Sequence, residues 1–210
     1  MSRVVVVVGA TSGIGRAIVR ACGAEGRGVV LAGRDADGLE RIAADCRIRF
    51  GVPARTEPFD ALLLDEHAAF VERAAKGFGD GVDGFILCYG EMPDESVARR
   101  DPEVLHRMIR VNVTSILHLL ECAADALAPR GAGFLCVLTS VAGDRGRPRN
   151  YLYGATKAAV STGLSGLRAR LARTGVSVVD VRPGIVDTAM TWGLPDLPVR
   201  ARPEAVARDT

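Results

Sequence analysis

The chain has 210 residues, close to the roughly 100–200 residues typical of one domain. Hydrophobic residues make up 48% of it and charged residues 25%, an ordinary globular composition that leaves little room for disorder away from the ends. The 27 basic and 25 acidic residues leave a formal net charge of +2. That charge is too small to indicate a nucleic-acid-binding protein or a protein held on an acidic membrane surface.

The metal-ligating residue types are dispersed along the chain. The five cysteines form no C-x-x-C pair, so the sequence predicts neither a disulfide framework nor a zinc site, and it favours a reducing cytoplasm. The three histidines, His67, His106 and His118, lack the mutual spacing of metal ligands. No stretch approaches the roughly 18 apolar residues that a membrane span requires. We therefore expect a soluble chain without a metal, with peripheral membrane association at most.

Short runs rich in Val, Ile and Leu alternate with longer segments of helical periodicity, as expected when parallel strands are buried on both faces by crossover helices. Strands are predicted at 4–8, 28–33, 55–58, 82–88, 133–139 and 176–182, and helices at 14–25, 36–48, 65–77, 102–128 and 151–173. Asp35, Asp65 and Asp101 are predicted N-caps, and Pro102 suits a first helical turn. The pattern predicts a single α/β domain over residues 1–194. Residues 195–210 are predicted to be an irregular tail in which Pro203 begins a further helix.

A glycine-rich loop follows the first predicted strand and opens the first helix, with Gly9, Gly13 and Gly15 in a G-x-x-x-G-x-G spacing. Such glycines permit a tight turn, close backbone approach to a diphosphate and close helix packing, while the helix N-terminus offers N–H groups and a positive dipole. An ordinary strand-to-helix turn is the alternative. The position directly after an all-valine strand favours a dinucleotide site.

The second predicted strand ends at Gly33-Arg34, where an NAD-binding protein would carry a carboxylate for the ribose 2′-hydroxyl. Gly33 supplies no such group. Arg34 offers a planar, permanent cation that suits a 2′-phosphate, so NADP(H) is favoured over NAD(H). A solvated surface arginine is the competing interpretation.

Tyr153 and Lys157 stand four residues apart on the predicted helix 151–173, which places them on one face. A lysine charge beside the phenol predicts that the tyrosine pKa falls from its ordinary value of about 10 toward neutrality, which would make Tyr153 a general acid and base. This spacing also arises by chance on many helices. Ser140 strengthens the functional interpretation, because it follows the predicted strand 133–139 and strand carboxyl ends face the ligand crevice in open α/β sheets.

In this order these residues resemble the short-chain dehydrogenases/reductases over essentially the whole chain. The resemblance implies a Rossmann-like doubly wound sheet in the order 3-2-1-4-5-6 and an enzyme that reduces a ketone to a secondary alcohol, reversibly. It implies that Ser140 orients the substrate carbonyl, that Tyr153 exchanges the proton, and that Lys157 lowers the tyrosine pKa and holds the nicotinamide ribose. It implies that Asn112 supports a proton-relay water.

The same resemblance implies a set of cofactor contacts, with the adenine at Asp60 and Ala61 and the nicotinamide at the segment 183–188. The implied contacts are Gly9, Thr11, Ser12, Gly13, Ile14, Gly15, Arg34, Asp60, Ala61, Gly90, Tyr153, Lys157, Pro183, Gly184, Val186 and Thr188. Members of the family form dimers or tetramers, so a homo-oligomer is expected. They also continue with another helix and a last strand that this sequence lacks.

One segment departs from the family pattern, since Cys88-Tyr89-Gly90 stands where most members carry Asn-Ala-Gly. With Phe59-Asp60-Ala61-Leu62 and the segments around Asp144 and Tyr153, it is similar to the branch of decaprenylphosphoryl-2-keto-ribose reductases, which implies a lipid-linked keto-sugar as substrate. Arg145, Arg147 and Arg149 are then candidates for a substrate phosphate, with a solvated basic loop as the alternative.

Other functions stay open at this point. A 3-oxoacyl or small-ketone reductase would carry the same catalytic residues, and a non-catalytic NADP-binding regulatory protein would keep the fold without turnover. Met190 and Trp192 follow the predicted nicotinamide segment, so they are expected to wall an apolar pocket, to lie on the surface or to form a dimer contact.

Overall fold

The computed structural model of the protein describes residues 3–76, 81–192 and 200–210. The strands of the sheet are β1 (Val4–Val8), β2 (Gly28–Gly33), β3 (Ala54–Pro58), β4 (Gly84–Leu87), β5 (Gly133–Leu138) and β6 (Val176–Val181). All of them pair in parallel, in the order β3-β2-β1-β4-β5-β6. The predicted doubly wound topology is confirmed, and the strand bounds differ from the predicted ones by at most two residues.

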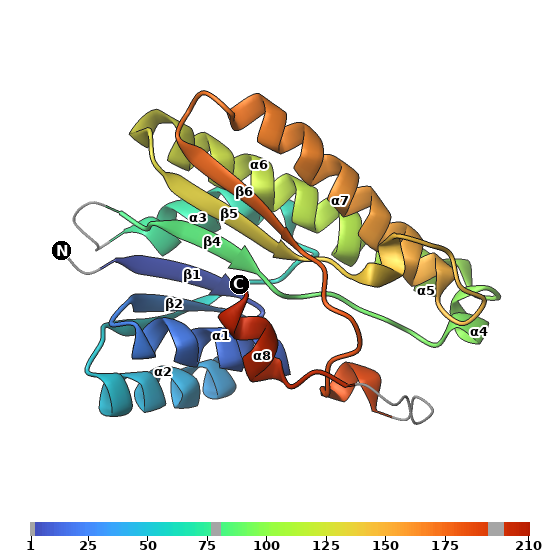
Figure 1. Cartoon of the computed structure of the whole chain (residues 1–210), viewed down its shortest axis with the longest axis horizontal. Coiled ribbons are helices and arrows are strands. Elements are labelled where there is room, and N and C mark those ends of the chain that lie inside the picture. The colour runs from blue at the N-terminus through green and yellow to red at the C-terminus, as the bar shows by residue number, and fades with distance from the viewer. Residues whose placement is uncertain (1–2, 77–80, 193–199) are drawn as a thin grey trace.

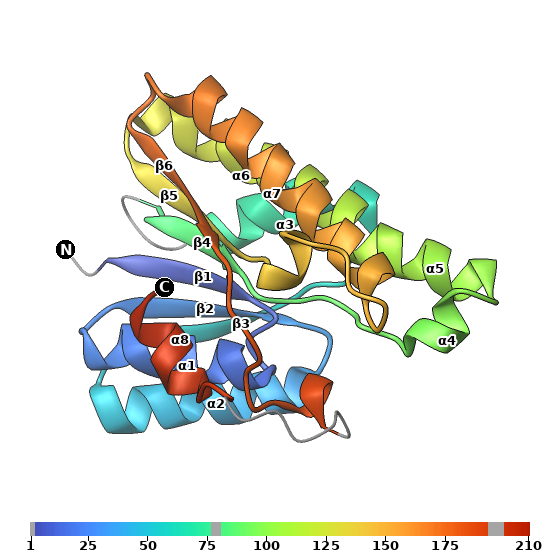
Figure 2. The same ribbon diagram turned by 45° about the vertical axis from the view of Figure 1, so that its right-hand side comes forward.

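Helices cover both faces of this sheet. They are α1 (Gly13–Ala24), α2 (Ala36–Phe50), α3 (His67–Ala75), α4 (Glu95–Ala98), α5 (Pro102–Ile109), α6 (Ile116–Leu127), α7 (Tyr151–Leu171) and α8 (Pro203–Arg208). Figures 1 and 2 show α1, α2 and α8 on one face, and α3, α6 and α7 on the other. The short helix α4 was not predicted, whereas the helix predicted to start at Pro203 is α8. Residues 195–199 of the predicted tail lie outside the described residues.

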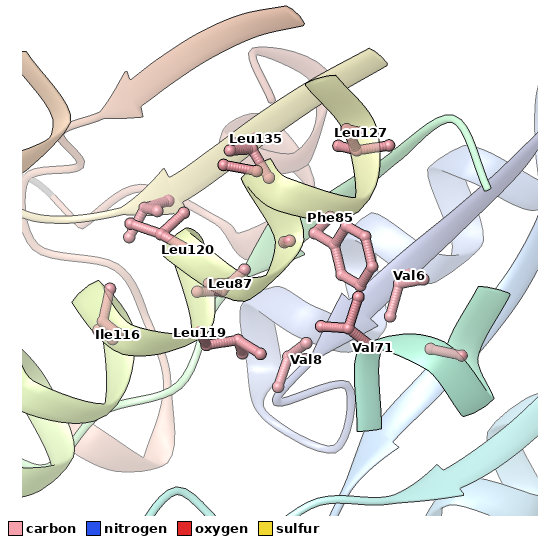
Figure 3. Packing of buried hydrophobic residues seen from close by; sticks show 14 of the residues in the cluster. Val6, Val8, Val71, Phe85, Leu87, Ile116, Leu119, Leu120, Leu127 and Leu135 are labelled. Carbon is pink, nitrogen blue, oxygen red and sulfur yellow. The ribbon is translucent and has the colours of Figure 1, made fainter. Parts of the chain in front are cut away.

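Strand β1 lies at the centre of the core. Its alternate valines enter two hydrophobic clusters, because successive side chains of a strand point to opposite faces. Val6 and Val8 pack with Phe85 and Leu119 on the side of α3 and α6, as Figure 3 shows. Burial on both faces explains why this strand is an uninterrupted apolar run.

Side-chain caps fix the starts of several helices. Ser12 accepts a hydrogen bond from the Gly15 N–H, and Asp35 and Asp101 cap α2 and α5, the last two as predicted. The predicted cap at Asp65 is wrong. A 3-10 turn over Leu64–Glu66 precedes α3, so this carboxylate lies inside the turn, and α3 begins at His67 without a side-chain cap. Residue 77, the predicted end of that helix, lies outside the described residues.

The predicted helix 102–128 is interrupted by a π-helical segment, Arg110–Ser115, between α5 and α6. Such segments are rare and occur frequently at functional sites. By length and composition alone, Pro102–Arg130 is also apolar enough to cross a membrane, contrary to the expectation from the sequence. Ile116 and Leu120 of this segment, however, are fully buried in the core against the sheet. Packing in the core therefore explains why the segment is apolar.

Candidate active site

The carboxyl ends of the strands border a cleft of about 1620 Å³. Most of the predicted site residues line it: Gly9, Thr11, Ser12, Ile14, Arg34, Asp60, Ala61, Gly90, Ser140, Tyr153, Lys157, Pro183, Gly184, Val186 and Thr188. Gly13, Gly15 and Asn112 are outside this lining. Segments far apart in the sequence therefore meet at one place, where a doubly wound sheet binds its ligand.

The glycine loop between β1 and α1 is shaped by close backbone contacts. Gly9 has a φ of +87°, and a Cβ there would lie 2.9 Å from the Tyr89 nitrogen. A Cβ on Gly15 would collide with the Gly9 carbonyl oxygen. These positions require glycine, and together they leave a hollow floored by backbone at the N-terminus of α1. Such a cradle fits the diphosphate of a dinucleotide.

The segment 183–188 closes the other side of this hollow. A Cβ on Gly13 would lie 2.9 Å from the methyl carbon of Thr188, so the start of α1 and this segment are in direct contact. The segment is held from behind by Ala201, which donates from its N–H to the Ile185 carbonyl at 2.8 Å and accepts from the Asp187 N–H at 2.9 Å.

Arg34 and Asp60 follow β2 and β3, so they line the cleft on the β3 side of the glycine loop. Asp60 Oδ1 accepts a hydrogen bond from the Leu62 N–H at 2.9 Å, which fixes the turn after β3. In the part of the chain that the structure describes, no carboxylate forms an ion pair with Arg34. Its guanidinium is therefore available to an anionic group at this end of the cleft.

Tyr153 and Lys157 lie side by side on α7, as predicted. The Lys157 Nζ is 5.6 Å from the centroid of the Tyr153 ring and donates to the Leu138 carbonyl at 3.1 Å. Both side chains are buried. Ser140 follows β5, and its hydroxyl oxygen accepts from the Ala142 N–H at 3.1 Å.

Two glycines bring the turn that follows Ser140 onto α7. A Cβ on Gly143 would lie 2.8 Å from the Ala158 nitrogen, and a Cβ on Gly154 would collide with the Ala142 carbonyl oxygen. Larger residues at either position would push the Ser140 turn away from the helix face that carries Tyr153. Sequence reasoning missed this positioning role, although a glycine next to Tyr153 within a helix is a signal of close packing.

The pKa values differ from the prediction. Burial raises the pKa of Tyr153 to about 12 and lowers that of Lys157 to about 8, an effect on the lysine that Asp180 and Cys88 oppose. The prediction that the lysine brings the tyrosine pKa near neutrality is wrong for this structure. The ammonium lies over the ring and bonds to a carbonyl, so it does not contact the hydroxyl.

Asn112 is fully buried in the π-helical segment and ties three elements together. Its Oδ1 accepts from the Glu91 N–H at 2.8 Å, and its Nδ2 donates to the Glu91 carbonyl at 2.8 Å and to Thr156 Oγ1 at 3.2 Å. The side chain thereby fixes the segment after β4 against α7. Its predicted role at a relay water stays a prediction.

The unusual Cys88-Tyr89-Gly90 segment forms one wall of the cleft. The Cys88 thiol donates to the Val8 carbonyl at 3.1 Å, and burial raises its pKa to about 12. It is one of five free cysteines. A Cβ on Gly90 would lie 3.1 Å from Asn112 Oδ1 and 3.6 Å from the Lys157 Nζ, so glycine lets this segment pack closely on Asn112. The neutral thiol therefore links this segment to the end of β1 by a hydrogen bond and adds no charge to the cleft wall.

The mouth of the cleft combines basic and apolar side chains. Arg145, Arg147 and Arg149 are exposed and line it, with Arg147 donating to the Val141 carbonyl at 3.2 Å. Met190 and Trp192 also line it, and Trp192 is 73% exposed. An amphipathic ligand with an anionic group would find both kinds of partner here.

Comparison with known proteins gives a consistent result. A family model described as short chain dehydrogenase matches residues 3–196. An uncharacterized oxidoreductase of Staphylococcus epidermidis is 34% identical over 191 residues, which cover 91% of this chain and 81% of that protein.

Two similar solved structures carry related cofactors. An actinorhodin polyketide ketoreductase with NADPH has a TM-score of 0.89 at 28% identity, covering 99% of this chain and 88% of that one. An alcohol dehydrogenase of the archaeon Thermococcus sibiricus, complexed with 5-hydroxy-NADP, has a TM-score of 0.87 at 28% identity, covering 100% of this chain and 88% of that one.

Proposed function

The chain belongs to the short-chain dehydrogenase family, and we propose that it reduces a ketone to a secondary alcohol with NADPH, or runs the reverse reaction with NADP. The observation that carries the proposal is the shared cleft, in which Ser140, Tyr153 and Lys157 lie with the glycine loop. Residues 1–194 would act as one cofactor-binding domain. The diphosphate would bind at Gly9 and the start of α1, and the nicotinamide at the segment 183–188.

When bound, NADPH would supply the hydride, because hydride chemistry belongs to the cofactor. The Ser140 hydroxyl would donate a hydrogen bond to the carbonyl oxygen of the substrate. With its pKa at about 12, Tyr153 is protonated at neutral pH and would give its proton to that oxygen as negative charge develops. The nearby Lys157 ammonium would then stabilise the phenolate, and Asn112 would support the return of a proton through water.

The preference for NADP rests on Arg34. The residue lines the adenosine end of the cleft beside Gly33, and within the described residues no acidic side chain pairs with it. A guanidinium can bind a 2′-phosphate with two parallel hydrogen bonds, whereas the ribose hydroxyl of NAD calls for a carboxylate.

For the substrate we favour a lipid-linked keto-sugar. Arg145 or Arg149 would bind its phosphate, and Trp192 and Met190 would contact its apolar part, since all four line the mouth of the cleft. A 3-oxoacyl or small-ketone reductase is the second candidate, and the similarity to a polyketide ketoreductase favours it.

The test follows NADPH absorbance with a ketone panel that includes a phosphorylated keto-sugar, a 3-oxoacyl thioester and an uncharged ketone. We expect turnover that Tyr153→Phe lowers by about 10²–10⁴-fold while NADPH binding, measured by fluorescence, persists. NADPH binding without oxidation by any ketone would instead support a regulatory protein. If Arg145→Ala and Arg149→Ala, made singly, each leave KM unchanged for the phosphorylated keto-sugar and for the uncharged ketone alike, the phosphate contact is ruled out.

A further inference from the structure

A buried carboxylate lies behind the proposed catalytic residues. Asp180 is in β6, with 8% of its side chain exposed. Its Oδ1 accepts a hydrogen bond from the Thr139 hydroxyl, and its Oδ2 accepts one from Arg182 Nε at 2.7 Å. Burial alone would raise the pKa of this carboxyl, but the hydrogen bonds from Thr139, Arg182 and Ser161 outweigh it and lower the pKa. Asp180 is therefore a carboxylate at neutral pH.

The partners of Asp180 are chain neighbours of the site residues. Thr139 directly precedes Ser140, and its N–H donates to the Val181 carbonyl at 2.8 Å. Arg182 directly precedes Pro183, whose carbonyl accepts from the Val141 N–H at 3.2 Å. The carboxylate thus holds together the end of β5, which presents Ser140, and the start of the 183–188 segment.

Arg182 extends this network toward the cleft mouth, where its Nη1 donates to Asp144 at 2.9 Å. Asp144 is about half exposed and begins the loop that carries the three arginines. The network therefore runs from a buried anion to the surface, and Asp180 is its inner end.

Lys157 lies close to this network, because its Nζ donates at 3.1 Å to the carbonyl of Leu138, the last residue of β5 before the strand end that Asp180 holds. Burial lowers the pKa of this lysine, and of the described groups that face it, Asp180 and Cys88 are the two that raise it. The Cys88 thiol is itself neutral, because burial raises its pKa to about 12, and Tyr153 presents only its ring to the ammonium. Asp180 is thus the anion that opposes the desolvation of Lys157.

We propose that Asp180 is a positioning residue for proton delivery: it orients the Thr139–Ser140 strand end and places a negative charge behind the Lys157 ammonium. This inference rests on the proposed function for its catalytic consequence. Its electrostatic part concerns the protein alone and can be measured without turnover. Neither the glycine loop nor the Ser140, Tyr153 and Lys157 pattern requires a carboxylate at this position of β6.

The chain is suited to a direct test, because Lys76 and Lys157 are its only lysines. Protein labelled with ¹³C at the lysine side chains gives two sets of NMR signals, and exposed Lys76 serves as the internal control. Asp180→Asn keeps an oxygen for Thr139 and removes the charge. We expect the Lys157 signals to titrate about one pH unit lower than in the wild type, with Lys76 unchanged.

The same variant tests the catalytic consequence. In ketone reduction we expect the alkaline fall of kcat to move to lower pH by the same amount, while KM for NADPH changes less than about two-fold. Thr139→Val keeps the charge and removes a hydrogen bond, so it lowers kcat without moving the alkaline limb. Asp144→Asn, at the exposed end of the network, leaves kcat and the pH of its alkaline fall unchanged.

An unchanged Lys157 titration in Asp180→Asn overturns the inference. Should that variant fail to fold, as judged by circular dichroism, Asp180→Ser provides a second neutral side chain with an oxygen. An unchanged Lys157 titration in Asp180→Ser would equally overturn the inference. If the wild type oxidises no NADPH with any ketone, the proposed function fails, but the NMR titration still tests the link between Asp180 and Lys157.

Discussion

Strands β1 and β6 belong to one sheet but are built from different residues. The five residues of β1 are all valine and all buried, whereas β6, at the edge of the sheet, carries the carboxylate of Asp180. The contrast extends to the neighbouring elements. The nucleotide half (β1, β2, β3, α1 and α2) contributes the glycine loop to the cleft, and the chemical half (β4, β5, β6 and α5 to α7) contributes the buried ammonium of Lys157.

The two halves therefore differ in how their buried groups affect stability. Buried apolar strands lower the free energy of the folded state, whereas a buried ammonium raises it. Proteins tolerate such groups mainly at functional sites, where perturbed pKa values are useful. We therefore expect the nucleotide half to lose stability when the backbone of its glycine loop is disturbed. We expect the chemical half to gain stability when the charge of Lys157 is removed.

The largest expected effect is at Gly9 in the nucleotide half. Gly9→Ala adds a Cβ at a φ of +87°, 2.9 Å from the Tyr89 nitrogen and 3.0 Å from the Cys88 carbonyl. We expect the free energy of unfolding to fall by about 4 kcal/mol, the sum of left-handed strain and overpacking. Urea denaturation measures the stability, and NADPH fluorescence the accompanying loss of binding.

Gly26→Ala is the matched control, because Gly26 has a φ of +74° and a Cβ added there would meet nothing within 4 Å. It isolates the strain, about 1 kcal/mol. Equal losses for the two alanine variants would show that close backbone approach does not constrain the loop.

The second effect has the opposite sign and lies in the chemical half. Burial lowers the pKa of Lys157 from 10.5 to about 8, which corresponds to about 3 kcal/mol of destabilisation at neutral pH. Lys157→Met has a similar length and no charge. We expect it to abolish ketone reduction and to raise the free energy of unfolding at pH 7, by less than about 3 kcal/mol because the Leu138 carbonyl loses its donor.

The pH dependence checks the cause. The unfolded chain binds more protons at Lys157 than the folded chain between its two pKa values, so this residue's contribution to stability rises as pH increases from about 8 to 10.5. The advantage of Lys157→Met over the wild type must therefore shrink across that interval. A constant advantage would point to packing rather than charge.

In both halves, the sequence predicted local features better than contacts between distant segments. Apolar runs predicted the strands other than β3, whose sequence is ARTEP. The glycine loop, Arg34, Ser140, Tyr153 and Lys157 line one cleft as expected. These signals are local, since periodicity and short motifs depend on neighbouring residues.

The rest depends on contacts between distant segments. Asp180 is a polar residue in an edge strand, and its hydrogen bond from Thr139, far away in the sequence, depends on how β5 and β6 pair. The Tyr153 pKa was mispredicted for the same reason: spacing along a helix shows that two side chains are neighbours, but not how deeply they are buried.

The third effect is at His67, which lies between Phe59, after β3 of the nucleotide half, and His118, on α6 of the chemical half. His67 on α3 is fully buried, its Nδ1 is 3.1 Å from Nδ1 of His118 on α6, and its ring packs on Phe59. Burial, with His118 as a smaller cause, lowers its pKa from 6.5 to about 4. Between pH 6.5 and about 4, the unfolded chain binds a proton at His67 that the folded chain does not bind. The free energy of unfolding therefore falls as pH falls through this interval, by about 2 kcal/mol at pH 5.

The measurement compares urea denaturation at pH 7 and pH 5. His67→Gln does not titrate, so its loss over this interval should be about 2 kcal/mol smaller than that of the wild type. His106→Gln on α5 is the control, because His106 is exposed, and it should behave as the wild type does. If His67→Gln loses as much free energy of unfolding between pH 7 and pH 5 as the wild type does, the acid sensitivity belongs to other groups.

The smallest effect is at Arg34, where the nucleotide half would use a side chain rather than backbone. Arg34→Ser removes the proposed partner of the 2′-phosphate, so we expect KM for NADPH to rise about ten-fold, equivalent to about 1.4 kcal/mol, and KM for NADH to stay unchanged. Arg41→Ser removes another exposed arginine, on α2 in the same half, and controls for the general loss of positive charge. An equal rise for both cofactors would mean that Arg34 binds a group they share, and cofactor choice would then have to be made elsewhere in the cleft.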